Sequence, residues 1–560
     1  MKSKATTFDR PGPLARLASI LVGVSTCLAA SPDASAAFGL TTTTDLYTVD
    51  TGAGLVFSVR RTEPANNTQA QGDIASLKFN GVEFQDQTRG SQVGVGIGGG
   101  TVTATTYGTS YIKIAVTAPD GGMTHYYMAR NGYPHVYMAT YFTSEPSLGN
   151  VRYIVRAFQS LLPNGPTPSD LTGNTGAIES SDIFGLANGQ TRSKHYSAHR
   201  QMDWTYTGAT GSGVGVWMVK GSAEGMSGGP FYRSLINQGD GAPGDQEIYE
   251  MINYGEAQTE AFRTGVLTPY TLVFTTGGTP STPDLSWQSG LGLTGYVAAS
   301  GRGAVAGVGI AGRDTAYQYV VGFANTKAQY WTTATSSGSY SCSGMLPGTY
   351  TQTIYKGELA VWTGSVTVTA GATKALNTIT ITGDPSATAT IWRIGNWDGT
   401  PSEFLNGVNM TTMHPQDVRM SSWGPKTYTV GSSSAATGFP AVQFRLANSP
   451  TTVKFTLTAA QAAAAHNLKI GITCAYIGGR PSVAVNGHAL TNPGASSQPS
   501  TRSVTIGTYR ENNTTFTYSI PAADFVTGAN TLTITPISGT TDLGTWLSAS
   551  WAYDCVELDN

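Results

Sequence analysis

The feature that most constrains the fold is a recurring pattern of short runs rich in β-branched and aromatic residues. Residues 55–59, 111–116 and 135–141 have the composition of β-strands. Asn80-Gly81 and Asn131-Gly132 are turn signals that separate such runs. No amphipathic helix of any length is visible, so the sequence predicts an all-β protein.

The composition narrows the class of protein further. A chain of 560 residues exceeds the usual size of one domain, so we expect several domains. The 69 glycines suit many tight turns between short strands. The formal net charge is −2 and no long basic tract is present, which argues against a nucleic-acid partner.

The first 36 residues have the pattern of a secretory signal peptide. A basic start precedes an apolar run over residues 17–30, and Ala34-Ser35-Ala36 offers a small-residue cleavage site. The apolar run is too short to span a bilayer, and no later run is long enough. We therefore expect a secreted, extracellular protein without a membrane partner.

Two segments rich in turn-forming residues, 277–283 and 383–386, divide the rest of the chain. They predict a large β-sandwich over residues 37–283 and an immunoglobulin- or fibronectin III-like sandwich over residues 284–383. A jelly-roll sandwich of the carbohydrate-binding kind is expected over residues 387–560. The alanine run at residues 459–465 is long enough for one helical turn only.

Three cysteines remain after the signal sequence, namely Cys342, Cys474 and Cys555. An odd number permits at most one disulfide within the chain, and Cys474 with Cys555 is a candidate pair because both fall in the last third. Buried free thiols are the alternative, and both interpretations remain open. No Cys/His spacing resembles a zinc site.

Basic residues gather around Lys194 in a chain that carries few charges. Arg192, His195, His199 and Arg200 are its neighbours in sequence. Such a cluster would attract an anionic substrate. Neighbouring cations also lower the pKa of a lysine, so that it can act as a neutral base. The alternative is a solvated loop, because lysine usually lies on the surface.

Several segments, taken in their order along the mature chain, carry a family resemblance. They are Glu145-Pro146-Ser147-Leu148-Gly149-Asn150, Thr191-Arg192-Ser193-Lys194, Ser227-Gly228-Gly229-Pro230-Phe231, Gly295-Tyr296-Val297, Asn396-Trp397-Asp398-Gly399 and Met413-His414-Pro415. Together they resemble the rhamnogalacturonan lyases of polysaccharide lyase family 4, of the type known from filamentous fungi.

The resemblance implies an architecture and a reaction. The architecture is a large mutarotase-like β-sandwich followed by a fibronectin III-like module and a jelly-roll module. The reaction is β-elimination on the pectin rhamnogalacturonan I, which cleaves the linkage between rhamnose and O4 of galacturonate on the galacturonate side of the oxygen and leaves a 4,5-unsaturated uronate. Such an endolyase must neutralise the uronate carboxylate, remove the C5 proton and protonate the leaving oxygen.

Two residues match the family in the first two of these tasks. Lys194 matches the catalytic lysine and is the expected base, with a pKa lowered by Arg192, Arg152 and burial. Arg152 matches a substrate-binding arginine, and a guanidinium can hold a carboxylate through two hydrogen bonds.

The residue expected to protonate the leaving oxygen differs from the family pattern, because Glu256 stands where the family has a catalytic histidine. A glutamic acid can protonate a leaving oxygen if burial and a nearby uronate raise its pKa. His195 and His199 are the alternatives.

Other matched positions have less defined roles. Tyr249 matches an active-site tyrosine, and Arg502 matches a jelly-roll arginine that is directed at substrate, whereas Met251 replaces a second tyrosine. Glu179 and Asp182 match family positions and could form a turn or bind a cation. The resemblance implies no catalytic metal or cofactor, permits a structural calcium ion without indicating its ligands, and leads us to expect a monomer.

Tryptophans are frequent in the last module, at positions 392, 397, 423, 546 and 551. They could stack on sugars, but most tryptophans of such sandwiches belong to the core.

Two other functions compete with the lyase. One is a non-catalytic pectin-binding protein derived from a lyase, suggested by the loss of the histidine at position 256. The other is a glycoside hydrolase that uses two carboxylates, for instance Glu179 with Glu256. The basic cluster favours elimination on an acidic sugar.

Overall fold

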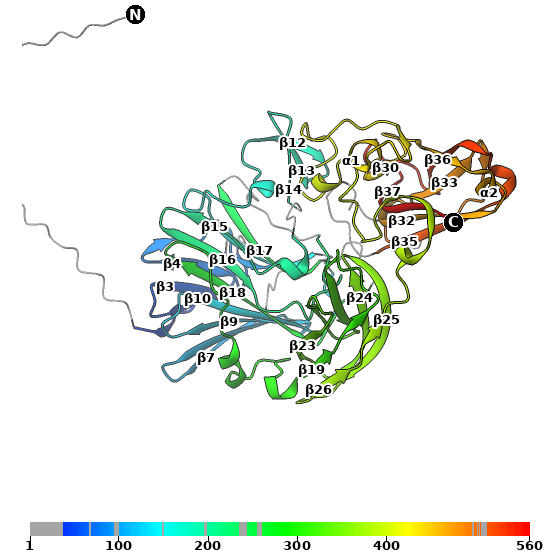
Figure 1. Cartoon of the computed structure of the whole chain (residues 1–560). Helices are drawn as coiled ribbons and strands as arrows, with labels where there is room; N and C mark the ends of the chain where they lie inside the picture. The colour runs from blue at the N-terminus through cyan, green and yellow to red at the C-terminus, as the bar shows by residue number, and fades with distance from the viewer. Residues whose placement is uncertain are drawn as a thin grey trace, which may run out of the picture.

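The computed structural model describes residues 37–65, 69–94, 100–147, 150–194, 199–233, 244–254, 260–495, 498–500, 502, 505 and 512–560. The predicted signal peptide, His195 and Glu256 lie outside these residues. Regular structure in the described part is almost entirely β-strand, with two four-residue helices, α1 (Ala435–Gly438) and α2 (Ala459–Ala462). The all-β prediction is confirmed, and α2 is the helical turn expected from the alanine run (Figure 1).

The N-terminal module is a large sandwich with two main sheets. The first has the order β1 (Gly39–Thr42), β2 (Leu46–Asp50), β3 (Leu55–Arg60), β4 (Ile74–Phe79), β5 (Val82–Glu83). The second has the order β15 (Tyr206–Gly211), β16 (Val214–Lys220), β18 (Leu267–Thr275), β10 (His135–Phe142), β9 (Met123–Arg130), β8 (Tyr111–Thr117), β7 (Thr101–Tyr107). A three-stranded sheet of β17 (Asp245–Tyr254), β11 (Asn150–Phe158) and β6 (Gln92–Val93) contributes to the same core.

The local sequence explains these strands. In β8 every second residue points inward, so that Ile112, Ile114 and Val116 are at most 1% exposed. Asn80 and Gly81 both have positive φ, 49° and 81°, and make the tight turn between β4 and β5. The predicted strands at residues 55–59, 111–116 and 135–141 correspond to β3, β8 and β10.

The middle module is a smaller sandwich with its own core. One face has the order β22 (Gln329–Thr333), β21 (Tyr319–Ala324), β24 (Gly348–Lys356), β25 (Leu359–Val368). The other strands are β23 (Tyr340–Met345), β19 (Gly303–Gly307) and β26 (Thr373–Leu376), with the short pair β20 (Ile310–Ala311) and β27 (Ile379–Thr380).

The C-terminal module packs two five-stranded sheets face to face. One contains β28 (Thr390–Gly395), β37 (Ser550–Asp559), β32 (His466–Tyr476) and β35 (Thr514–Ile520), with β30 (Val442–Phe444) also paired to β37. The other has the order β29 (Lys426–Thr429), β31 (Thr451–Leu457), β36 (Gly528–Ile537), β33 (Arg480–Val485), β34 (His488–Ala489).

The structure shows whether the three cysteines pair and whether the tryptophans of the last module are buried. Cys342, Cys474 and Cys555 are all free and buried, so the candidate Cys474–Cys555 disulfide was wrong. Trp392, Trp397 and Trp551 are at most 5% exposed. Trp392 and Trp551 belong to the core of the last module, on which Trp423 and Trp546 pack, whereas Trp397 belongs to the core of the middle module. The tryptophans of the last module are therefore mainly core residues, as expected.

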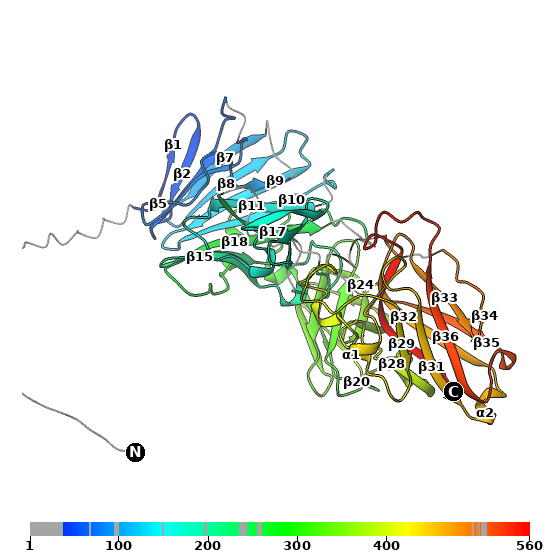
Figure 2. The same ribbon diagram turned by 90° about the horizontal axis from the view of Figure 1, so that it is seen from above.

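Ion pairs join the large sandwich to the middle module, which lies between the other two modules (Figure 2). Arg302 donates to both carboxylate oxygens of Glu224 at 2.7 and 2.9 Å. Arg233 does the same to Glu358 at 2.7 and 2.5 Å. Bidentate pairs of this kind fix the relative orientation of two surfaces. Among the helices described here, none is long and apolar enough to cross a membrane.

Candidate active site

Lys194 lies at the end of a small sheet that projects from the large sandwich. The sheet has the order β12 (Asn174–Glu179), β13 (Ile183–Leu186), β14 (Thr191–Ser193). Thr191 and Ser193 are buried, whereas Lys194 is half-buried. The backbone N–H of Lys194 donates to the carbonyl of Asp182 at 3.1 Å, and its Nζ lies 5.8 Å from the centre of the Phe184 ring. The lysine is thus held by its backbone while its amine stays near the surface.

The C-terminal module anchors the strand that carries this lysine (Figure 1). Oδ2 of Asp417 accepts from the backbone N–H of Thr191 at 2.7 Å and from its hydroxyl at 3.0 Å. Arg419 binds the same carboxylate at 2.8 and 2.7 Å. Burial alone would raise the pKa of Asp417, but these hydrogen bonds from Arg419 and Thr191 lower it to about 2. The ionised Asp417 therefore ties β14 to the last module.

A second contact between the modules involves Glu179, which is 6% exposed. Its Oε2 lies 3.1 Å from Nε2 of His414, and its Oε1 accepts from Nε of Arg502 at 2.7 Å. Arg502 also donates to Asp182 at 3.0 Å. Burial opposes ionisation of Glu179, but the hydrogen bonds from His414 and Arg502 outweigh it and lower its pKa.

Arg502 therefore reaches from the last module to the hairpin beside Lys194. Two of its nitrogens bind the carboxylates of Glu179 and Asp182, while Nη2 is buried and has no hydrogen-bond partner among the described residues. Because Asp182 also accepts from the Lys194 backbone, the structure brings these two predicted site residues together. Glu179 and Asp182 serve as partners of a cation from the protein itself.

Arg152 and Tyr249 form a second group, on adjacent strands β11 and β17. The Arg152 guanidinium carbon lies 5.5 Å from the centre of the Tyr249 ring. The Tyr249 hydroxyl donates to Glu247, which also accepts from Arg156 at 3.2 Å. Burial, followed by the charge of Glu247, raises the pKa of Tyr249 well above its ordinary value. The ring of this tyrosine therefore supports the arginine while its hydroxyl is directed to Glu247.

Two further residues singled out from the sequence lie beside Trp204, and one lies outside the described residues. Met251, which stands in place of a second tyrosine, is 2% exposed and packs with Ile154 and Trp204. His199 contacts the edge of Trp204 with 5.8 Å between ring centres. Glu256 follows the end of β17 by two positions in the sequence, outside the described residues.

Asp417 was not found by reasoning from the sequence, although the neighbouring segment Met413-His414-Pro415 carried part of the family resemblance. Within the described ranges, no three His, Cys, Asp or Glu residues are grouped in a way that could hold a metal ion. Ligands for a structural calcium ion cannot be assigned there.

Comparison with known proteins agrees with this architecture. A family model described as "Rhamnogalacturonan lyase B, N-terminal" matches residues 38–295. Models described as domain II and domain III of polysaccharide lyase family 4 match residues 301–376 and 390–558. The chain belongs to polysaccharide lyase family 4, a class of enzymes that cleave polysaccharides by elimination.

Similar relatives specify the kind of lyase. Rhamnogalacturonate lyase A of Aspergillus aculeatus is 45% identical over 94% of this chain and 97% of its own length. The probable rhamnogalacturonate lyase A of Aspergillus terreus is 45% identical over 90% and 92% of the two chains. Rhamnogalacturonate lyase A of Emericella nidulans is 43% identical over 94% and 96%.

Proposed function

We propose that this enzyme is a rhamnogalacturonan lyase that cleaves the rhamnose–galacturonate bond of rhamnogalacturonan I by β-elimination. The observation that carries the proposal is the similarity to rhamnogalacturonate lyases over 94% of the chain, combined with a lysine that follows a strand bound by the last module. The glycoside hydrolase alternative loses support because Glu179 is buried and bound to His414 and Arg502.

The chemistry assigns one task to each of three groups. The Arg152 guanidinium binds the uronate carboxylate and stabilises the negative charge that develops when C5 loses its proton. The Lys194 amine takes that proton, and the released electron pair forms the C4–C5 double bond. The C4–O4 bond breaks as this double bond forms, and an acid protonates the departing oxygen, which becomes a hydroxyl of the rhamnose fragment.

Glu256 is the proposed acid, with His195 and His199 as the alternatives. Replacement of Glu256 by Gln should reduce the elimination rate by about 10²- to 10⁴-fold, the usual contribution of a general acid. Replacement by His should retain activity and shift its pH dependence. If the Glu256→Gln enzyme keeps the full rate, a histidine is the acid instead. The elimination rate of His199→Ala would then test that residue.

The central experiment follows the absorbance of the unsaturated uronate during incubation with rhamnogalacturonan I. Wild type should produce it, and Lys194→Ala should lose at least about 10²-fold in rate. Lys78→Ala, which removes an exposed lysine of the same module, is the matched control. No unsaturated product from wild type at any pH, with binding retained, would identify the non-catalytic pectin-binding protein instead.

The proposed setting follows from the same assignment. A polymeric plant cell-wall substrate requires an enzyme outside the cell, which agrees with the expected signal peptide over residues 1–36. Expression in a eukaryotic secretion host should yield a mature chain that begins near Ala37, as read by N-terminal sequencing. Size-exclusion chromatography with light scattering should give the mass of one chain.

A further inference from the structure

Trp217 has an environment unlike that of the core tryptophans. It lies on β16, and two neighbouring positions on the sheet are glycines, Gly208 on the adjacent strand and Gly215 two residues earlier. A Cβ atom at Gly208 would lie 2.7 Å from Cε3 of Trp217, and one at Gly215 would clash with the other end of the indole. The indole therefore lies flat over both glycines, and its Nε1 is fixed by a 3.2 Å hydrogen bond to Thr275.

The free side of this ring opens into a surface hollow of about 290 Å³. Trp204 and Tyr206 line both this hollow and a second one of about 420 Å³. Gly221 and Ser222 line the second hollow and a third of about 430 Å³. The three hollows are therefore neighbours, and we call them the junction groove because the second and third lie at the boundary between the large sandwich and the middle module.

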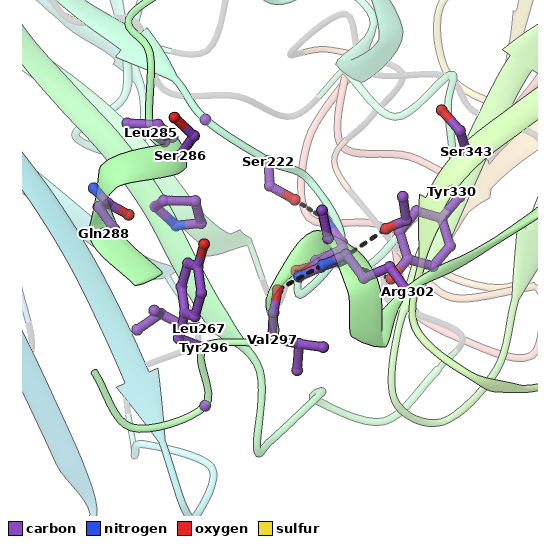
Figure 3. A pocket seen from close by; sticks show the side chains of 16 residues that line it. Ser222, Leu267, Leu285, Ser286, Gln288, Tyr296, Val297, Arg302, Tyr330 and Ser343 are labelled. Carbon is purple, nitrogen blue, oxygen red and sulfur yellow. Dashed lines mark hydrogen bonds and ion pairs between the residues drawn. The ribbon is translucent and has the colours of Figure 1, made fainter. Parts of the chain in front are cut away.

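Aromatic side chains recur along this groove. Tyr206 is 38% exposed and meets Trp217 edge-on at 5.4 Å, and Trp331 of the middle module lines the second hollow. Figure 3 shows Tyr296 and Tyr330 on opposite sides of the third hollow. Trp217, Tyr206 and Trp331 are not part of the three main hydrophobic cores, and each is half-buried or exposed.

The charged groups along the groove are paired within the protein or buried. In the third hollow, Arg302 is bound to both oxygens of Glu224, and the Tyr330 hydroxyl donates to the same carboxylate at 2.7 Å (Figure 3). In the second hollow, the amine of Lys220 is buried and makes no hydrogen bond with the described residues, and the charge of Glu250 acts on it. Hydroxyl and amide groups complete the lining, among them Thr205, Ser222, Thr282, Ser286, Gln288 and Ser343.

We propose that the junction groove binds a neutral oligosaccharide strand, beside the site that holds the acidic backbone. Flat aromatic rings match the apolar faces of pyranose rings, and the hydroxyl and amide groups between them match sugar hydroxyls. A uronate would gain little here because the Arg302 guanidinium is held by Glu224 and the Lys220 amine is buried. Arg152 and Lys194 line none of the three hollows, and His199 lines the first. The occupant is therefore a chain of uncharged sugars, such as a neutral branch of the polymer.

Direct binding tests the proposal without any reference to lyase activity. Isothermal titration of the full-length protein with β-1,4-galactopentaose should give saturable binding. Trp217→Ala and Trp331→Ala should each weaken it about tenfold or more, as truncation of a central aromatic anchor usually does. Trp362→Ala is the matched control, because Trp362 also lies against a glycine, Gly364, but packs on the core of the middle module.

A second measurement guards against misfolded variants and against the wrong ligand. Trp217→Phe keeps a flat ring and should retain most of the affinity, and all variants should keep the wild-type rate on unbranched backbone oligosaccharides. Competition by an acidic backbone oligosaccharide in the Lys194→Ala background should be absent. The proposal is overturned if galactopentaose does not bind, if Trp217→Ala and Trp331→Ala bind it like wild type, or if the acidic oligosaccharide displaces it.

Discussion

Removing the Asp417 carboxylate should slow the enzyme although this residue lies in the C-terminal module. In Asp417→Ala the backbone N–H of Thr191, a residue only 2% exposed, loses its acceptor. A buried donor left without a partner costs about 1–3 kcal/mol. The ion pair with Arg419 adds less than about 1 kcal/mol, because the Arg419 side chain is 38% exposed.

A loss of about 2 kcal/mol corresponds to a factor of about thirty in the docking equilibrium of β14. We therefore expect kcat to fall by up to about thirtyfold, since Lys194 directly follows this strand. KM should change little, because Asp417 binds Thr191 and Arg419 and is not among the proposed substrate contacts. Asp417→Asn keeps the shape of the side chain and should have a smaller effect.

The assay combines initial rates on rhamnogalacturonan I with hydrogen exchange of a peptide that covers residues 183–194. Asp542→Ala is the control, because Asp542 also binds an arginine and a backbone N–H in the same module, Arg445 and Ala549. Asp417→Ala should show faster exchange at Thr191 together with the lower kcat. Faster exchange with an unchanged kcat would refute the view that this anchor positions the lysine.

Three further outcomes are expected. Desolvation lowers the pKa of the buried His125 to about 3, so its contribution to stability is complete above pH 6.5. That contribution is lost at about 1.4 kcal/mol per pH unit between pH 6.5 and 3. His125→Gln should flatten the decline of the unfolding free energy over that range, and an equal decline would contradict the assignment. The pKa of Cys342 and of Cys474 is raised to about 12 by burial, so native protein at pH 8 should resist iodoacetamide and keep its Tm in dithiothreitol; rapid labelling would show that these thiols are reachable. Arg502→Lys cannot bind Glu179 and Asp182 with the same fork geometry, so its Tm should fall by a few degrees, whereas an unchanged Tm with a raised KM would assign Arg502 to substrate binding alone.

The strands could be predicted from sequence because burial and local pattern coincide in them. The alternation of Ile112, Ile114 and Val116 signals one buried face, and Asn80-Gly81 supplies the positive φ values that its turn requires. The disulfide between Cys474 and Cys555 could not be excluded in this way, because cysteine spacing does not reveal whether the two thiols meet.

The candidate site was only partly predictable, for a related reason. Family matches placed Lys194 and Arg152, but the contacts of Arg502 with Glu179 and Asp182 span more than three hundred positions of sequence. The junction groove combines residues of two modules, and the flat position of Trp217 depends on Gly208 across the strand pair. Such pairings arise from the tertiary fold and leave no periodic pattern in the sequence.

The distance along the chain between Thr191 and Asp417, 226 positions, has a consequence for biosynthesis. The ribosome releases β14 long before it makes the carboxylate that secures it, so the nascent large sandwich can fold without an ordered lysine strand. A chain that terminates between the middle and last modules would retain Lys194 and Arg152 and still lack the Asp417 carboxylate that binds Thr191. Proteolytic loss of the last module would in the same way inactivate an otherwise intact catalytic domain.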